Sequence, residues 1–414
     1  MNKHHRHCSA GATLILLVLF GCSIAGMTPP QQKVPVAATP PMGWNNWNHF
    51  GAEVSEDLVR AQADAMVKNG MKTAGYTYLN IDDGWAGDRD GDGFIHPNAK
   101  FPDMKGLADF IHGLGLKFGI YTAATVKTCM GLKGSRGHEE QDAETYAKWG
   151  VDFVKVDWCS DETDETLVYN EYKKLGEALR KTGRPIVYSI GAPGAAWRWG
   201  ASVGGNLWRT SIDIKDNWNW MSAVGFSQNG LERFAGPGHW NDPDMIEVGN
   251  DGFDNAILGK NDAWSLRRPA PPELPGMTDD EYRTHMSLWC LLAAPLIVGA
   301  DLAHLKPSAL SILTNPEVIA VDQDALGMQG YRVAQEGPLE VWVKPLTGGR
   351  KAVGLFNREL GTMAVTVYFR DIRVGADARL RDLWARKDLG RFHEKYTANV
   401  AGHGVVMVQV TSEE

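Results

Sequence analysis

Residues 139–159, EEQDAETYAKWGVDFVKVDWC, contain the pattern that decides the fold. Residues 139–148 are predicted to form a helix, and the apolar run at residues 151–156 is predicted to form a strand. Amphipathic segments and short apolar runs of this kind alternate along most of the chain. Alternation of helices and strands is typical of a parallel sheet covered by helices.

Eight short apolar runs are predicted to be strands, separated by helical segments or loops. They are residues 42–47, 76–81, 116–121, 151–156, 186–189, 207–211, 240–245 (the weakest) and 296–299. Eight units over about 280 residues match the size of a (β/α)8 barrel. An open doubly wound sheet is the alternative, and the absence of a G-x-G-x-x-G run after the first strand disfavours it.

The predicted helices and a change of pattern near residue 320 complete the outline. Ser55 is a predicted N-cap for a helix that Gly70 ends, and further helices are predicted at residues 105–112, 139–148, 165–181 and 281–293. After about residue 320, apolar runs separated by turns predict a small antiparallel β-sandwich of about 90 residues. The predicted domains are a barrel at residues 39–320 and a sandwich at residues 321–414.

The N-terminus has the features of an export signal. Lys3 and Arg6 are followed by an apolar run at residues 14–20, which is too short to span a membrane. The run Leu19-Phe20-Gly21-Cys22 resembles a bacterial lipoprotein box, with Cys22 as the lipidated residue. Residues 1–26 are therefore predicted to be a signal and residues 27–38 a linker. Lipoprotein, ordinary secretion and a retained anchor stay open, and all three place the protein outside the cytoplasm, in the periplasm, at the cell surface or secreted.

Composition excludes several classes of protein. With 43% hydrophobic and 22% charged residues, the chain is neither disordered nor collagen-like nor a multi-span membrane protein. The net charge of −8 gives no basic footprint for nucleic acid. No cluster has the spacing of a zinc site, and we expect no metal or other cofactor.

Three cysteines lie beyond the predicted signal. Cys290 sits within an apolar run and is predicted to be a buried thiol. An oxidising compartment permits one disulfide, which leaves Cys129 and Cys159 as the predicted pair.

Acidic residues gather where four predicted strands end, which is where barrel enzymes place their chemistry. They are Asp82 and Asp83, then Asp157, then Asp213, and finally Asp242 and Asp244, often with Trp beside them. A single Asp at the end of a strand is often only a helix cap or a turn former. Four convergent ends favour function, because cleavage of a glycosidic bond needs a pair of carboxyls with aromatic walls.

Strand alternation assigns roles to two of these acids. Lys155 and Asp157 share one face, and the apolar Val154 and Val156 share the other, so the Lys–Asp face is expected to line the pocket. Arg209, Ser211 and Asp213 are likewise expected to share a face. A cation beside Asp157 would keep it ionised as a nucleophile, and Asp213 would act first as acid and then as base.

Several motifs, taken in order, resemble glycoside hydrolase family 27, the retaining α-galactosidases and α-N-acetylgalactosaminidases. They are residues 41–47 (PMGWNNW), 82–85 (DDGW), 118–121 (FGIY), 155–159 (KVDWC), 209–213 (RTSID), 240–245 (WNDPDM) and 321–327 (VDQDALG). The resemblance implies a (β/α)8 TIM barrel with a C-terminal β-sandwich, Asp157 as nucleophile and Asp213 as acid/base. It implies that galactose is held by Trp47, Asp82, Asp83, Tyr121, Lys155 and Arg209, with the two adjacent Asp on the 4- and 6-hydroxyls and the Cys129–Cys159 bridge crossing the rim of the site.

One departure bears on the substrate. Family α-galactosidases usually carry a Cys and then an acid or amide for the 2-hydroxyl, whereas this chain has IGAPGAAW at residues 190–197. Small residues leave room for a 2-acetamido group. We expect α-galactosidase activity on galactose-containing oligo- or polysaccharides first and α-N-acetylgalactosaminidase activity second. Asp82-Asp83 argues against a β-L-arabinopyranosyl preference, and a non-catalytic galactoside-binding protein is the alternative from another class.

One further motif resembles a calcium loop. Residues 88–93, DRDGDG, match the first half of an EF-hand loop, but its twelfth position is Ala99 instead of Glu. We expect a surface hairpin turn here.

Overall fold

The structure is a computed structural model and describes Met1, residues 36–253 and residues 276–413. Apart from Met1, the predicted signal (residues 1–26), the lipidation candidate Cys22 and most of the predicted linker (residues 27–38) lie outside the described residues. In the described ranges, every helix is too short or too polar to cross a membrane.

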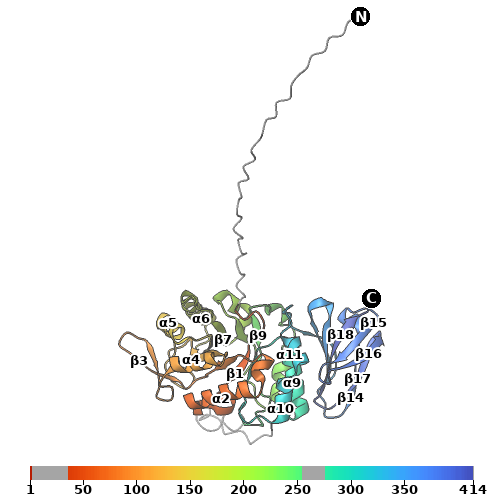
Figure 1. Cartoon of the computed structure of the whole chain (residues 1–414), viewed down its shortest axis with the longest axis horizontal. Coiled ribbons are helices and arrows are strands. Elements are labelled where there is room, and N and C mark those ends of the chain that lie inside the picture. The colour runs from red at the N-terminus through yellow and green to blue at the C-terminus, as the bar shows by residue number, and fades with distance from the viewer. Residues whose placement is uncertain (2–35, 254–275, 414) are drawn as a thin grey trace. The chain divides into compact units, whose positions relative to one another are not determined.

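In the described residues, eight parallel strands form one sheet, in the order β10-β1-β2-β5-β6-β7-β8-β9. Strands β1, β7 and β9 of this sheet are labelled in Figure 1, among the helices that surround it. A parallel bridge between Ile246 and Val298 joins the two ends of this sheet. The strands are β1 (Met42–Asn45), β2 (Tyr78–Asn80), β5 (Lys117–Ala123), β6 (Phe153–Asp157), β7 (Val187–Gly191), β8 (Leu207–Arg209), β9 (Trp240–Asp242) and β10 (Leu296–Val298). All eight coincide with predicted strands, and the predicted TIM barrel is confirmed.

The helices around this sheet follow the local signals of the sequence. Ser55 accepts a hydrogen bond from the Leu58 amide and caps α2, and Gly70 follows that helix with φ of 87°. The helices are α1 (Trp47–Phe50), α2 (Glu56–Lys68), α3 (Met71–Ala74), α4 (Met104–Gly113), α5 (Glu139–Trp149), α6 (Glu165–Lys181), α7 (Trp218–Phe226), α9 (Asp279–Leu292), α10 (Pro307–Leu313) and α11 (Pro316–Asp322). Short 3-10 turns lie at Gly51–Glu53, Ala196–Arg198, Gly200–Val203 and Glu232–Phe234.

Several strands are shorter than predicted, and two of these differences, in β1 and β8, move predicted site residues out of a strand. β1 ends at Asn45, so Trp47 begins helix α1. β8 ends at Arg209, so Ser211 and Asp213 stand in the following loop and the predicted shared strand face stops at Arg209. In this loop the Ser211 hydroxyl donates to the Pro243 carbonyl at 2.9 Å.

The predicted surface hairpin is confirmed at the calcium-like motif. β3 (Ala86–Arg89) pairs antiparallel with β4 (Ile95–Pro97). In the turn between them, Asp90 accepts hydrogen bonds from the amides of Asp92 and Phe94.

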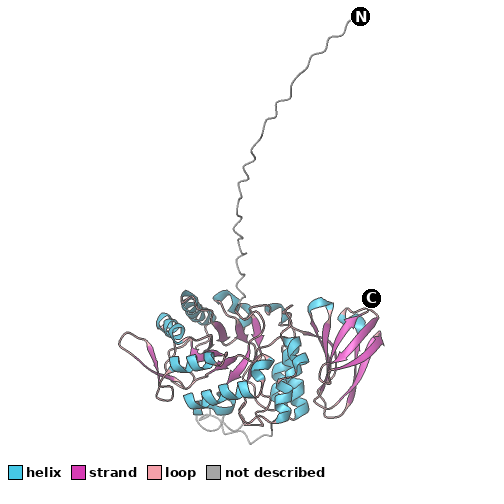
Figure 2. Ribbon diagram, viewed as in Figure 1, coloured by secondary structure: helices cyan, strands magenta, loops and turns pink. Residues whose placement is uncertain are grey.

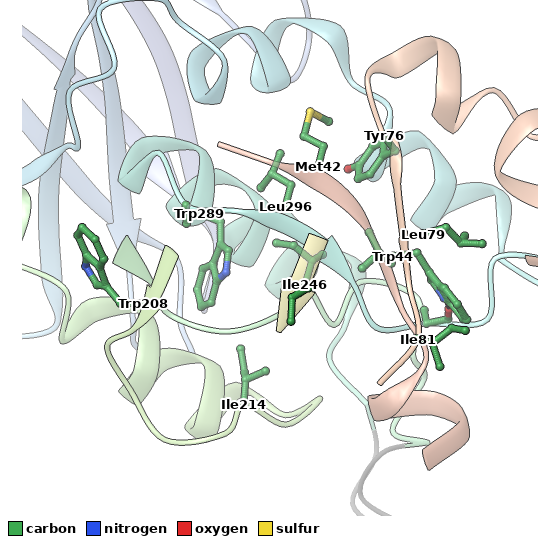
Figure 3. Close-up of a cluster of buried hydrophobic side chains, with 14 of the residues drawn as sticks. Met42, Trp44, Tyr76, Leu79, Ile81, Trp208, Ile214, Ile246, Trp289 and Leu296 are labelled. Atoms are coloured by element: carbon green, nitrogen blue, oxygen red, sulfur yellow. Dashed lines mark hydrogen bonds between the residues drawn. The ribbon is translucent and has the colours of Figure 1, made fainter. Parts of the chain in front are cut away.

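The barrel core is built from side chains of strands and flanking helices (Figure 3). Trp44 of β1, Leu79 of β2 and Trp289 of α9 are fully buried. Two of these side chains also donate hydrogen bonds to loop backbone. The Trp44 indole donates to the Ala300 carbonyl after β10, and the Trp289 indole donates to the Asp244 carbonyl after β9, each at 2.8 Å. The apolar core therefore fixes the backbone at the strand ends where the acids stand.

The C-terminal part is antiparallel and strand-rich (Figure 2). In the described residues, one sheet has the order β11-β12-β13-β18-β15-β16 and a second pairs β14 with β17. Val353 and Val408 of the first sheet and Val365 and Val367 of the second belong to one buried cluster, as expected for a sandwich. The strands are β11 (Tyr331–Glu336), β12 (Leu339–Pro345), β13 (Lys351–Asn357), β14 (Met363–Tyr368), β15 (Asp377–Asp382), β16 (Lys387–His393), β17 (Lys395–Val400) and β18 (Val405–Ser412), with 3-10 turns at Thr347–Gly349 and Phe369–Ile372.

A buried polar group joins the sandwich to the barrel. The Lys344 ammonium of β12 donates to the carbonyls of Cys290 in α9 and Asp322 in α11, at 3.2 and 3.3 Å. Cys290 is a buried free thiol, as predicted. The Asp322 carboxyl is fully buried, and burial raises its pKa to about 8.

This raised pKa predicts how Asp322→Asn changes the pH dependence of stability. Because the folded protein holds the Asp322 proton up to about pH 8, while the unfolded chain releases it near pH 4, the stability due to this group is present below pH 4 and is lost as pH rises toward 8. The wild type is expected to lose unfolding free energy across this window, and the Asn variant is expected to lose less. Urea unfolding at pH 5 and pH 8 measures the difference, and equal losses in the two proteins would contradict the expectation.

Candidate active site

The predicted site residues lie at the carboxyl ends of neighbouring barrel strands. Asp82 and Asp83 follow β2, and Tyr121 lies within β5. In β6, Lys155 and Asp157 are half-buried while Val154 and Val156 are fully buried, which confirms the predicted division of that strand into two faces.

The Lys155 ammonium forms its close ion pair with Asp82. Its Nζ lies 2.8 Å from Asp82 Oδ2, and the same oxygen accepts a hydrogen bond of 2.8 Å from the Asn45 amide of β1. The Asp82 amide in turn donates to the Asn46 side chain at 2.7 Å. The end of β1 thus fixes the direction of the Asp82 carboxylate.

Asp157 ends β6 in a desolvated position. Burial raises its pKa, and the nearby carboxylates of Asp82 and Asp213 raise it further, whereas the positive charges of Lys155 and Arg209 lower it by less. The neighbouring cation therefore lowers the pKa of Asp157, in the expected direction, but burial has the larger effect. Sequence alternation detects the cation but not the loss of water around the carboxyl.

A glycine on the neighbouring strand makes room for the Asp157 carboxylate. Gly191 ends β7 and pairs with Asp157 across the sheet. A Cβ at Gly191 would collide with Asp157 Oδ1. The sequence analysis did not assign this glycine to the site, and only the cross-strand register identifies it.

Asp213 stands in the loop after β8 with 88% of its side chain exposed. Its Oδ1 lies 3.0 Å from Arg209 Nη2, and this positive charge lowers the pKa of the Asp213 carboxyl. The negative charge of Asp213 contributes to the raised pKa of Asp157.

Arg209 also pairs with an acid that the sequence analysis noted at a strand end but did not assign to the site. Asp244 Oδ2 lies 2.9 Å from Arg209 Nη2 and accepts a hydrogen bond of 2.8 Å from the Ile214 amide. Asp244 is buried, adopts a φ of 93°, and has a pKa raised to about 6 by burial. A non-glycine residue in this left-handed conformation is often a mark of a functional site.

Asp83 is held by the segment that the disulfide encloses. Cys129 and Cys159 are bonded as predicted, and the Met130 amide donates to Asp83 Oδ2 at 2.9 Å. The Tyr121 hydroxyl lies 3.5 Å from Cys159 Sγ. Burial raises the pKa of Asp83 to about 6. The bridge therefore connects the ends of β5 and β6 beside the two adjacent aspartates.

The remaining predicted residue, Trp47, is half-buried at the start of α1, and its amide donates to the Asn45 side chain at 2.8 Å.

A cavity of about 30 Å³ lies within the barrel. It is lined by residues that include Asn45, Lys155, Arg209, Asp242 and Asp244. In the part of the chain that the structure describes, no three His, Cys, Asp or Glu side chains gather in a way that could hold a metal ion.

Comparisons with known proteins agree with this fold and identify the family. Residues 39–265 and 274–324 match the family model of α-galactosidase A, and residues 336–410 match that of the α-galactosidase C-terminal β-sandwich domain. An α-galactosidase of Cyamopsis tetragonoloba is 43% identical over 90% of this chain and 86% of its own length.

Two solved structures extend the comparison. The structure of α-galactosidase I from Mortierella vinacea superposes with a TM-score of 0.83 at 33% identity, over 92% of this chain and 99% of the other. The α-galactosidase of Saccharomyces cerevisiae, solved with raffinose, superposes with a TM-score of 0.81 at 26% identity, over 92% of this chain and 100% of the other. With a two-part model match across most of its length, the chain belongs to the α-galactosidase family, glycoside hydrolase family 27.

Proposed function

We propose that this protein is a retaining exo-α-galactosidase that cleaves terminal α-D-galactosyl groups from oligo- or polysaccharides. The observation that carries the proposal is the placement of two carboxyls at the carboxyl ends of strands of one parallel barrel, with Asp157 at the end of β6 and Asp213 in the loop after β8. Two such carboxyls are what double displacement at a sugar requires. The similarity to α-galactosidases, one of them solved with raffinose, supports the choice of galactosides.

In the proposed reaction, Asp157 attacks C1 of the galactosyl group while Asp213 donates its proton to the departing oxygen. The C1–O bond to the leaving group breaks, and an ester between C1 and Asp157 forms. Asp213 then removes a proton from water, which attacks C1 and releases Asp157 as a carboxylate. Two inversions leave the product with the α configuration of the substrate.

The electrostatics of the free site fit the second step better than the first. Arg209 lowers the pKa of Asp213, so this carboxyl is ionised in the free site, which is the state in which it can accept a proton from water. For the first step Asp213 must carry a proton. Arg209 also pairs with Asp244, whose Oδ2 lies 2.9 Å from Arg209 Nη2. We propose that, when substrate binds, Arg209 keeps its ion pair with Asp244 and loses the one with Asp213. The pKa of Asp213 would then rise.

The aspartates after β2 are proposed to select galactose. Asp82, oriented by Lys155 and Asn45, and Asp83, oriented by the Met130 amide, would accept hydrogen bonds from the 4- and 6-hydroxyls. Charged acceptors give strong hydrogen bonds and discriminate against sugars that lack the axial hydroxyl. Trp47 and Tyr121 would supply the apolar wall, with Arg209 and the Cys129–Cys159 bridge at the rim.

One observation favours α-N-acetylgalactosaminidase activity as a second candidate. The end of β7 and the segment that follows it, residues 190–197, carry no carboxyl, and Ala192 and Ala196 of that segment are small and buried. This segment follows the strand that pairs with β6, so it borders Asp157.

A parallel assay of three substrates tests these proposals. We expect kcat/KM for an aryl α-galactoside to exceed that for the α-N-acetylgalactosaminide and the β-L-arabinopyranoside by at least about tenfold, because only galactose satisfies both Asp82 and Asp83 without extra bulk. Proton NMR of the first product should show the α anomer. A faster α-N-acetylgalactosaminide would select the second candidate, and binding of galactosides without turnover would indicate a non-catalytic binding protein.

We also propose that the protein is exported. The Cys129–Cys159 disulfide supports this proposal, because such bonds persist in oxidising compartments. Mass spectrometry of the purified N-terminus would reveal either a cleaved signal or a lipid on Cys22, and an intact Met1 would contradict export with cleavage.

A further inference from the structure

The loop that carries Asp213 contains a second, fully buried aspartate. Asp216 lies three positions after Asp213, between β8 and α7, and is 0% exposed, whereas the Asp213 side chain is 88% exposed. A buried carboxylate is costly unless hydrogen bonds compensate for the lost water. The N-cap of α7 is Asn217 and not Asp216. The buried Asp216 carboxyl is therefore expected to have a role other than capping this helix or making the surface soluble.

The Asp216 carboxylate collects donors from segments far apart in the chain. Its Oδ2 accepts hydrogen bonds from the Tyr282 hydroxyl of α9 at 2.8 Å and from the Gly252 amide at 2.6 Å. Its Oδ1 accepts a hydrogen bond from the Met277 amide at 3.0 Å. The Tyr282 hydroxyl also accepts a hydrogen bond from the Asp251 amide at 3.1 Å, which ties the same segment a second time.

These contacts hold the loop at Asp216, and Asp244 and Trp220 hold the peptide that joins Asp213 to Ile214. Asp244 accepts a hydrogen bond from the Ile214 amide, and the Trp220 indole donates to the Asp213 carbonyl. The backbone from the Asp213 carbonyl to Asp216 is thus anchored, while the exposed Asp213 carboxyl has a side-chain contact with Arg209. The position of that carboxyl depends on the backbone that Asp216 anchors.

We infer that Asp216 is a positioning residue for Asp213: by binding Tyr282, Gly252 and Met277 it sets the loop so that the Asp213 carboxyl reaches the oxygen of the leaving group. The inference rests on the proposed role of Asp213 as acid/base. A general acid works only within hydrogen-bond reach of its target, and a shift of about 1 Å can cost about 100-fold in rate.

The test compares leaving groups in the Asp216→Asn enzyme. Acid assistance is needed to expel a sugar, as from melibiose, but hardly to expel 2,4-dinitrophenolate. We expect kcat/KM for melibiose to fall by about 10- to 100-fold and kcat/KM for the dinitrophenyl α-galactoside to change by less than about threefold. Azide should also speed turnover of the dinitrophenyl substrate, because it attacks C1 of the galactosyl-Asp157 ester without a base and yields α-galactosyl azide.

Two further variants make the result decisive. Asp251→Asn is the matched control, since it removes a surface ion pair with Lys306 and keeps the backbone amide that donates to Tyr282, and both rates should stay within about twofold. Tyr282→Phe removes one donor to Asp216 and should give the melibiose-selective loss in weaker form. If Asp216→Asn does not fold, Tyr282→Phe decides, and an unchanged Tyr282→Phe enzyme would overturn the inference.

Asp213→Ala, measured alongside, separates this inference from the proposed function. Loss confined to melibiose and azide acceleration in Asp213→Ala would support its acid/base role. With that role supported, an Asp216→Asn enzyme that loses both substrates equally, or neither, would overturn the positioning role of Asp216 alone. An Asp213→Ala enzyme without leaving-group dependence would overturn the acid/base assignment itself.

Discussion

Replacing Asp157 with Asn is expected to lower kcat for an aryl α-galactoside by at least about 10⁴-fold. An amide cannot form the ester to C1, and no other step replaces it. The fold should persist, because burial already raises the pKa of Asp157 and the fold therefore disfavours its charge. Steady-state kinetics measures the loss, and circular dichroism with thermal unfolding measures the fold.

Asp161→Asn serves as the control for Asp157→Asn. Asp161 is exposed in the loop after β6, so its substitution removes a carboxylate of the same region without touching the barrel interior. Its activity should equal that of the wild type. An Asp157→Asn enzyme that keeps more than a few per cent of wild-type activity, free of contaminating enzyme, would remove Asp157 from the nucleophile role.

Replacing Asp82 with Ala is expected to lower the unfolding free energy by about 3–5 kcal/mol and to abolish measurable α-galactoside turnover. The substitution leaves the Lys155 ammonium, 18% exposed, without the carboxylate that lies 2.8 Å from it. It also removes a proposed acceptor for a galactose hydroxyl. Chemical denaturation measures the first effect, and steady-state kinetics measures the second.

The double variant Asp82→Ala, Lys155→Met separates the two effects of this substitution. Removing both charges should restore most of the lost stability, because an apolar side chain fills the space without a stranded charge. Turnover should stay absent, because the sugar still lacks its acceptor. Recovery of turnover in the double variant would exclude a substrate-binding role for Asp82, and unchanged stability in Asp82→Ala would exclude a stabilising ion pair.

The barrel could be predicted because its signals are local. Each of the eight strands is a short apolar run next to a helical segment, and Ser55 and Gly70 mark the ends of α2. Asp82, Asp83 and Asp157 were found for the same reason, since a parallel barrel brings strand ends to one side. The family resemblance then supplied the expected roles of these acids.

The parts that sequence could not give depend on contacts between distant segments. Asp244 joins the site through Arg209 and the Ile214 amide, and Gly191 through its register with Asp157. The buried Asp216 was not singled out at all, because its donors come from Gly252, Met277 and α9. Helix α7 was also not predicted. Its buried side chains Met221, Val224 and Phe226 follow two half-buried Trp and an exposed Asn, so helical periodicity is weak.

The charge state of the site shows the same limit. The sequence places Lys155 two positions before Asp157, where a cation is expected to help to keep that carboxyl ionised. In the folded protein the ammonium bonds to Asp82, and burial outweighs the attraction that remains, so the pKa of Asp157 is raised. Spacing along a strand gives the face of a side chain but not which of two nearby acids receives the cation.

The most direct test of the proposed chemistry is to trap the covalent intermediate with 5-fluoro-α-D-galactosyl fluoride and to locate the sugar by peptide mass spectrometry. The fluorine slows hydrolysis of the ester and lets it accumulate. We expect the fluorogalactosyl group on Asp157, in an adduct that disappears with time as turnover resumes. A label on Asp213 or on any other residue, or an absence of adduct together with a β-configured product, would contradict the assignment of Asp157 and Asp213.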